Sequence, residues 1–361
     1  MEWYIAALSL KQFVEGTYET AIRTLAAAEA TLDAEIESAA NTEWFVLDEA
    51  RARLRGLCLQ QEDNITYAHH LAGEFDIVAP LAAYTNPEVT SQLRSQLPSS
   101  PFFAFYDTFL VKENQYEELF KKMVEEVVAL YGMHFPEVVG RPLPVRVVRD
   151  IASAAEAWYT NGEIIVNIAR PVTQEKLQQL VAHEVMHHVQ ALACRRTRAS
   201  ALFLEGGAEY AVDLVFPPGS PRAAHLERFF GTSPADASTL VSVSAIRSSL
   251  SWRHVVRIAS AMFEGTMDDA TGNAEMESLA LLRQDSWPSV DFMRQWGFGY
   301  VATYAIGKLV IGEFVDAVRT CIPHATKWDV FVAFTRCTPT PRTAQRYAAK
   351  CEWVSAWFRS C

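Results

Sequence analysis

The chain has 361 residues, of which 50% are hydrophobic and 21% charged, so it can form one large domain or two ordinary ones. Its formal charge of −11 argues against a sequence-independent nucleic-acid surface, and we expect no nucleic-acid partner. No apolar run approaches the roughly 18 residues of a membrane-spanning helix, and the first residues do not resemble a signal peptide. We therefore expect a cytoplasmic protein without a membrane span. The oligomeric state stays open.

Six cysteines are scattered along the chain, at positions 58, 194, 321, 337, 351 and 361, and none forms a C-x-x-C pair. A chain of this length does not need disulfides for its stability, so reduced thiols are the first expectation. The alternative is a disulfide among the four C-terminal cysteines, Cys321, Cys337, Cys351 and Cys361.

Residues 1–135 are predicted to form a helical N-terminal region. Ala, Glu and Leu recur at helical spacing in three segments, Leu8–Ala40, Trp44–Leu59 and Asn114–Leu130. The pattern changes to one typical of strands after the prolines that begin at Pro136. We therefore divide the chain into this helical region and a second region, residues 136–361.

The second region is predicted to begin with strands and to continue as helices. β-Branched residues favour strands over Leu143–Val148 and Glu163–Ile168. Apolar spacing predicts helices over Thr173–Ala193 and Ala201–Phe216, with Thr173 and Ser200 as N-caps. Later helices are expected over Trp252–Phe263, Tyr300–Val318 and Arg342–Phe358. The expected fold class is α+β and predominantly helical.

The first of these helices carries an H-E-x-x-H motif, His183-Glu184-Val185-Met186-His187. Four residues of helix turn about 400°, so the two imidazoles lie on one face, one turn apart. This geometry lets both bind one Zn²⁺ ion while Glu184 reaches a water molecule at the open position. His188 lies about 100° farther round the helix and is expected to be a hydrogen-bonded neighbour, not a ligand. The alternative is a pair of core histidines that match the motif by chance.

The next predicted helix contains two adjacent glycines, Gly206 and Gly207. Each costs about 1 kcal/mol in a helix relative to alanine, so we expect a close approach to a neighbouring helix backbone. Glu205 follows His187 by 18 positions (205 − 187), which a helix reversal would bring back over the motif. A carboxylate there completes a His₂Glu zinc site. Glu209 is the alternative third ligand.

These motifs resemble the gluzincin metallopeptidases, and they are similar to those of predicted bacterial zinc peptidases. In that clan a glutamate on a second helix completes the site of the H-E-x-x-H helix, and Glu205-Gly206-Gly207-Ala208 is similar to the N-E-G-x-A of zinc aminopeptidases. In thermolysin-like members an acid four residues later supports the first histidine, which gives Glu209 that role here. The resemblance implies a zincin-like domain in which the edge strand of a small sheet binds substrate. Glu163–Ile168 could be that edge or an ordinary interior strand.

The resemblance also implies a residue that stabilises the oxyanion. Tyr304-Ala305-Ile306-Gly307 resembles the Y-x-x-G of zinc aminopeptidases, whose tyrosine has this role, although Lys308 stands where that family has alanine. Tyr300 and His254 are rival donors, and a core tyrosine is the alternative. The G-x-M-E-N stretch that binds the substrate amine in aminopeptidases is absent, and Asn161-Gly162-Glu163 resembles it only in part.

Together, these patterns predict a zinc-dependent hydrolase that cleaves peptide bonds in a peptide or protein substrate. Glu184 would take the proton of the attacking water and deliver it to the leaving amine. Two alternatives are an inactive zincin-fold binding module and a helical interaction protein with a chance motif. The sequence leaves the substrate, the endo- or exopeptidase mode and the role of the N-terminal region open.

Overall fold

The structure is a computed structural model that describes residues 86–95, 108–194 apart from 152, 154 and 171, then 201–263, 266–278, 290, 298–339, 344 and 348–361. The helices expected over Leu8–Ala40 and Trp44–Leu59 lie outside these residues, as does most of the predicted N-terminal region. The division at residue 135 therefore stays a prediction. Within the described part of the chain, no helix is both long and apolar enough to cross a membrane.

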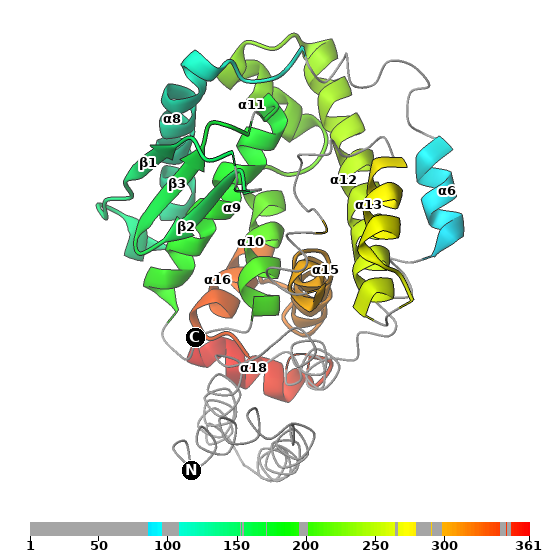
Figure 1. Cartoon of the computed structure of the whole chain (residues 1–361). Helices are drawn as coiled ribbons and strands as arrows, with labels where there is room; N and C mark the ends of the chain where they lie inside the picture. The colour runs from blue at the N-terminus through cyan, green and yellow to red at the C-terminus, as the bar shows by residue number, and fades with distance from the viewer. Residues whose placement is uncertain are drawn as a thin grey trace, which may run out of the picture.

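The described residues form an α+β structure that is predominantly helical, which confirms the expected fold class (Figure 1). The first described helices are α6 (Pro87–Ser95) and α8 (Glu113–Gly132), followed by the 3₁₀ turn η1 (Pro136–Val138). The strands are β1 (Val145–Val148), β2 (Ala157–Thr160) and β3 (Glu163–Asn167). The later helices are α9 (Gln174–Ala193), α10 (Ala201–Val215), α11 (Ser220–Phe230), α12 (Pro234–Phe263), α13 (Asp269–Ser278), α15 (Phe298–Cys321), α16 (Lys327–Arg336) and α18 (Cys351–Ser360).

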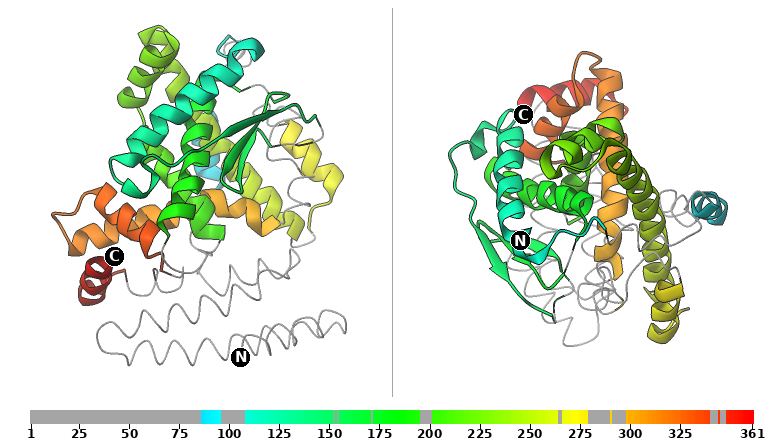
Figure 2. Two further views of the ribbon diagram at one scale, coloured as in Figure 1. Left: turned by 90° about the vertical axis from the view of Figure 1, so that its left-hand side faces the viewer. Right: turned by 90° about the horizontal axis from the view of Figure 1, so that it is seen from above.

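The three strands form one sheet in the order β1-β3-β2, with β1 parallel and β2 antiparallel to β3. The strand prediction over Glu163–Ile168 is confirmed as β3, and of the two alternatives left open for it, the interior strand holds, because β3 pairs on both sides. The four-residue strand β2 was not predicted; among the described strands, it forms the edge beside α9. The sheet and α12 lie on opposite sides of the helices α9, α10 and α15 (Figure 1, Figure 2).

A tight hairpin joins β2 to β3 at Asn161 and Gly162. Both residues have positive φ, 49° and 84°, as the two central residues of a type I′ turn require. Asn and Gly are the residues that adopt this backbone at least cost. The partial resemblance of Asn161-Gly162-Glu163 to an amine-binding stretch is thus accounted for by turn formation.

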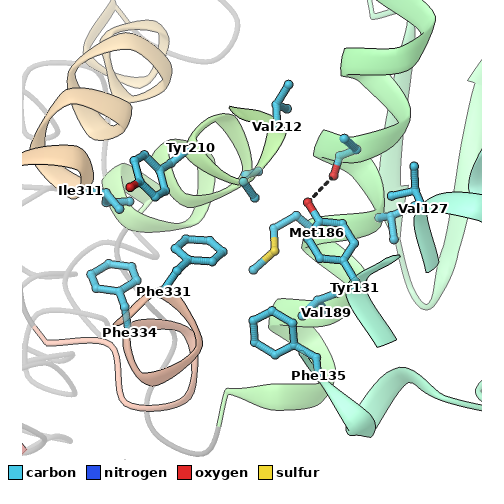
Figure 3. Close-up of a cluster of buried hydrophobic side chains, with 14 of the residues drawn as sticks. Val127, Tyr131, Phe135, Met186, Val189, Tyr210, Val212, Ile311, Phe331 and Phe334 are labelled. Atoms are coloured by element: carbon cyan, nitrogen blue, oxygen red, sulfur yellow. Dashed lines mark hydrogen bonds between the residues drawn. The ribbon is translucent and has the colours of Figure 1, made fainter. Parts of the chain in front are cut away.

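The helix α9, which carries the H-E-x-x-H motif, was predicted to within one residue. The hydroxyl of Thr173 accepts a hydrogen bond from the amide of Lys176 at 3.2 Å, so Thr173 is the N-cap as predicted. The hydroxyl of Tyr131 on α8 donates to the carbonyl of Ala182 at 3.0 Å (Figure 3). This bond fixes α9 against α8 at the residue before the motif.

A single apolar core supports α9 from behind the motif. It contains side chains of α8, α9, α10, α15 and α16, including Val127, Tyr131, Met186, Val189, Tyr210, Ile311, Phe331 and Phe334 (Figure 3). Met186 and Val189 are fully buried there, so this core holds α9 in place beside the motif residues.

Helices α10 and α15 cross at two glycines. A Cβ atom on Gly206 would fall inside the backbone of Gly307, and one on Gly307 would fall on the carbonyl of Leu202. The expected close approach of a helix backbone to the Gly206-Gly207 pair is therefore present, with α15 as the neighbour. The crossing brings Glu205 of α10 near Tyr304 of α15.

Three expectations for the C-terminal half need correction. The helix expected to begin at Trp252 begins at Pro234, because Ser- and Ala-rich sequence continues it backwards. The helix expected over Arg342–Phe358 is not continuous, since a turn at Ala348–Lys350 precedes α18. Cys321 and Cys351 form a disulfide between the end of α15 and the start of α18, so the disulfide alternative holds for them, while Cys194, Cys337 and Cys361 form no disulfide with another described cysteine.

Candidate metal site

The site begins with the three motif residues on α9. His183 and Glu184 are buried, with 7% and 5% of their surface exposed, and His187 is partly buried. The Nε2 atoms of the two histidines lie 3.1 Å apart, although they belong to successive turns. Both imidazoles therefore present the same nitrogen to one point in space.

Glu205 reaches this point from α10. Its Oε2 atom lies 3.3 Å from Nε2 of His183 and 3.4 Å from Nε2 of His187. Ligand atoms about 2.0–2.1 Å from a zinc ion at tetrahedral angles lie about 3.3 Å from one another. The three atoms thus form a triangle of the size that one tetrahedral ion needs, and His183, His187 and Glu205 could hold it.

Each imidazole has a side-chain oxygen near its other nitrogen. Nδ1 of His183 lies 3.2 Å from Oε1 of Glu209, and Nδ1 of His187 lies 2.9 Å from Oε1 of Gln190. An Nδ1–H group that donates to an oxygen leaves the lone pair of Nε2 for a metal ion. Glu209 occupies the supporting place predicted for it and is not among the three converging ligand atoms.

The site strongly favours positive charge. Burial alone would lower the pKa of His183, but its interactions with Glu205 and Glu209 outweigh burial and raise it to about 10. The same balance raises the pKa of His187, again through Glu205. Burial would raise the pKa of Glu209, yet His183 holds it at about 2. A pocket that keeps a carboxylate ionised although the group is buried is suited to bind a cation.

Glu184 lies in a different environment from the other two site glutamates. Burial raises the pKa of its carboxyl and outweighs the opposing effect of the neighbouring imidazoles. The backbone N–H of Tyr159, on the edge strand β2, lies toward this carboxyl group and lowers its pKa. A buried carboxyl with a raised pKa accepts a proton more readily than an exposed one and can release it again.

Tyr304 stacks directly on the first histidine of the motif. Its ring lies 5.8 Å from that of His183 at an interplanar angle of 15°, and 5.6 Å from the ring of Trp252 at 13°. The predicted oxyanion donor is thus at the site, between a motif histidine and a tryptophan of α12. The rival His254 lies two residues from Trp252, about 200° round α12, so it faces away from Tyr304. The side chain of the other rival, Tyr300, lies outside the described part.

Two lysines surround the supporting acid Glu209. Lys176 and Lys308 both lower its pKa, although less than His183 does. Nζ of Lys308 pairs with Asp213 at 2.8 Å, and Nζ of Lys176 pairs with Glu156 at 3.4 Å. Lys308, the residue at which the chain departs from the aminopeptidase pattern, therefore belongs to the charge network behind His183.

Sequence analysis missed three parts of this site: Gln190, Trp252 and the edge strand β2. Gln190 follows His187 by three residues, one helical turn, and that spacing was a usable signal. Neither Trp252 nor β2 had one, because their places depend on tertiary contacts. His188 faces Tyr159, whose hydroxyl lies 3.3 Å from its Nδ1 atom, and it is not one of the converging ligands.

Comparison with protein-family models found no match, and comparison with curated proteins also found none. Among solved structures, the fold is similar to that of a "putative lipoprotein from Colwellia psychrerythraea", with a TM-score of 0.58 and 13% sequence identity. The similarity covers 89% of this chain and 61% of that chain. At this identity the likeness concerns the fold alone.

Proposed function

We propose that the protein is a zinc-dependent peptidase of the gluzincin type, with zinc held by His183, His187 and Glu205. The observation that carries the proposal is the triangle of ligand atoms, with separations of 3.1, 3.3 and 3.4 Å. Two nitrogens and one carboxylate oxygen are a ligand set of catalytic zinc, which keeps a further position open. The oxygen acceptors on both Nδ1 atoms support this assignment, since they direct both Nε2 lone pairs at the same point.

In this proposal Glu184 carries out the proton transfers. When bound, zinc would supply Lewis-acid chemistry, because it acidifies water and polarises a carbonyl group. Glu184 takes the proton of the attacking water and then delivers it to the nitrogen of the leaving amine. Its raised pKa suits this double role, since the protonated form must persist until the peptide bond breaks.

Tyr304 donates a hydrogen bond to the developing oxyanion in this proposal. Its ring stacks on that of His183, one of the three proposed ligands, and the stack between His183 and Trp252 fixes it. A fixed donor needs no reorganisation when charge develops on the substrate oxygen.

The substrate would lie along the edge strand β2. The N–H of Tyr159 points off the sheet toward Glu184, so an extended peptide paired with this edge would pass the catalytic carboxyl. This proposal moves the substrate-binding edge from Glu163–Ile168 to Ala157–Thr160. It gives a peptide or protein as the substrate class.

A cytoplasmic location remains a prediction, and the Cys321–Cys351 disulfide argues against it, because the cytosol keeps thiols reduced. Titration of free thiols in protein purified without reductant would discriminate. Protection of two of the six cysteines would favour an oxidising compartment.

The proposal is tested by metal analysis and one substitution. Protein purified without chelators should contain about one zinc per chain, and His183→Ala should lose it. Glu184→Gln keeps the shape of the side chain and should bind zinc normally. Hydrolysis of a peptide library should then fall about 10²–10⁴-fold, because proton transfer is lost. Less than half an equivalent of zinc, with no uptake on addition, would contradict the site, and wild-type turnover by Glu184→Gln would contradict the mechanism.

A further inference from the structure

The amide of Gln190 lies between the second motif histidine and the backbone of α10. Its Oε1 atom lies 2.9 Å from Nδ1 of His187, and its Nε2 atom donates to the carbonyl of Leu204 at 2.9 Å. We propose that Gln190 is a positioning residue that fixes His187 relative to α10 and thereby sets the affinity of the site for zinc. This inference rests on the proposed zinc site.

The orientation of the amide follows from its partner on α10. The carbonyl of Leu204 can only accept a hydrogen bond, so the NH₂ group of Gln190 must face it. The amide oxygen then faces His187 and can only accept, so Nδ1 of His187 must carry the proton. A backbone carbonyl on α10 therefore determines, through one side chain, that Nε2 of His187 is the ligand atom.

The contact also joins the two elements of the ligand triangle. Leu204 directly precedes Glu205, the ligand on α10, while His187 is the ligand on α9. Gln190 thus holds His187 at a set distance from the backbone that carries the third ligand. His183 is tied to α10 by another route, because its acceptor Glu209 is itself on that helix.

The two supporting acceptors differ in charge. Glu209 is a carboxylate with two lysines near it, whereas Gln190 is neutral. A second supporting carboxylate would add a negative charge beside Glu184, Glu205 and Glu209. A neutral amide orients the imidazole and avoids this repulsion.

Gly207 leaves the space that the amide occupies. A Cβ atom at position 207 would lie 3.0 Å from Nε2 of Gln190, closer than side chains normally approach. Its other neighbour, Cδ1 of Ile311, would be at an ordinary 3.8 Å. The second glycine of the pair thus has a role distinct from that of Gly206, which packs against Gly307.

The first experiment measures zinc affinity by competition with a chelator. Gln190→Leu removes both hydrogen bonds, and its zinc affinity should fall about 10- to 100-fold, as for other residues that support a metal ligand. Gln190→Glu keeps the acceptor for His187 but loses the hydrogen bond to the carbonyl of Leu204, so its zinc affinity should lie between those of the wild type and Gln190→Leu. Equal affinities of wild type and Gln190→Leu would overturn the proposal.

The second experiment is a double-mutant cycle with Gly207→Ala. The added methyl group should displace the amide and weaken zinc binding in the wild-type background. In the Gln190→Leu background it should change the affinity less than about twofold, because the bond is already gone. Gly312→Ala is the matched control, since its Cβ would meet Tyr210 at an ordinary 3.6 Å, and its zinc affinity should equal that of wild type. An effect of Gly207→Ala that is the same in both backgrounds would overturn the proposal.

A third readout does not need the metal. The Nδ1–H proton of His187 should be protected from exchange in ¹⁵N-resolved NMR spectra of the wild type and of Gln190→Glu, and lost in Gln190→Leu. If the wild type shows this proton but binds no zinc, the proposed function fails and the hydrogen bond stands. If the wild type binds zinc without a protected proton, the positioning role fails and the zinc site stands.

Discussion

The two sides of the candidate site are built in different ways. On α9, one turn of helix brings His183, Glu184 and His187 together, and the sequence of that helix suffices to do so. On the other side, Glu205 and Tyr304 belong to two helices whose relation depends on the crossing of Gly206 and Gly307. The α9 side is therefore fixed by local structure, whereas the opposite side is fixed by tertiary packing. Substitutions on the two sides should fail in different ways.

The largest effect on zinc binding should come from Glu205, the proposed ligand that helix packing brings close to α9. Glu205→Ala removes an atom that lies 3.3 and 3.4 Å from the two Nε2 atoms, so zinc binding should be almost lost. Glu209→Ala removes only the acceptor of His183 and should cost about 10- to 100-fold in affinity. Competition with a chelator measures both. The reverse ranking would show that Glu209 is the third ligand.

The next effect separates chemistry from metal binding on the packed side. Tyr304→Phe removes one hydroxyl, keeps the ring stacked on His183, and should leave the zinc content unchanged. Loss of one oxyanion donor should lower kcat about 10²–10³-fold, with KM less affected. Steady-state kinetics on a cleaved peptide measures this. Normal turnover by Tyr304→Phe, with loss in Tyr300→Phe or His254→Ala, would move the role to that residue.

A smaller effect tests the crossing itself. Gly206→Ala forces a methyl group into the backbone of Gly307 and should lower the free energy of unfolding by about 1–3 kcal/mol. Alanine otherwise stabilises a helix by about 1 kcal/mol relative to glycine, so a loss identifies the crossing as its cause. Urea denaturation measures the change, with Gly312→Ala as the control that should not be destabilised. Equal stability of the two variants would mean that the helices can separate at no cost.

The same contrast explains what the sequence could predict. The Thr173 cap, the apolar face and the H-E-x-x-H spacing all lie within α9, and the helix was predicted to within one residue. The glycine pair indicated a close helix approach but could not identify Gly307 as the partner, because about 100 residues separate them along the chain. The spacing of 18 residues between His187 and Glu205 indicated Glu205 as a ligand only on the assumption that the chain reverses direction between the two helices.

The features that could not be predicted concern order and pairing in space. The β-branched residues of Glu163–Ile168 predicted a strand, but a strand buried on both faces has the same composition at the centre or at an edge. The short strand β2 could be identified only from its pairing with β3 across the Asn161-Gly162 turn. The spacing of Gln190 from His187 could have indicated the contact between these two side chains, but not the bond to the carbonyl of Leu204, because that partner is a backbone atom that no side-chain pattern reveals.

The smallest expected effect comes from Lys308→Ala, which should raise the affinity for zinc and lower the free energy of unfolding. Lys308→Ala restores the residue of the aminopeptidase pattern and removes a cation that lowers the pKa of Glu209. Glu209 should then accept a stronger hydrogen bond from His183. The site would also carry less of the positive charge that repels the zinc ion. Because Lys308 and Asp213 are about one third exposed, the change should be screened to about 0.2–1 kcal/mol, or an affinity gain of less than about fivefold.

Loss of the Lys308–Asp213 pair should at the same time lower the free energy of unfolding by a similar small amount. Chelator competition and urea denaturation at low and high salt measure the two changes, and both should shrink as salt rises, since the charges are partly exposed. Lys121→Ala is the matched control, because it removes an exposed lysine whose partner, Glu117, belongs to α8 and not to the site. Weaker zinc binding by Lys308→Ala would mean that this lysine holds Glu209 in place by packing. The charge network behind His183 would then belong to the packed side of the site.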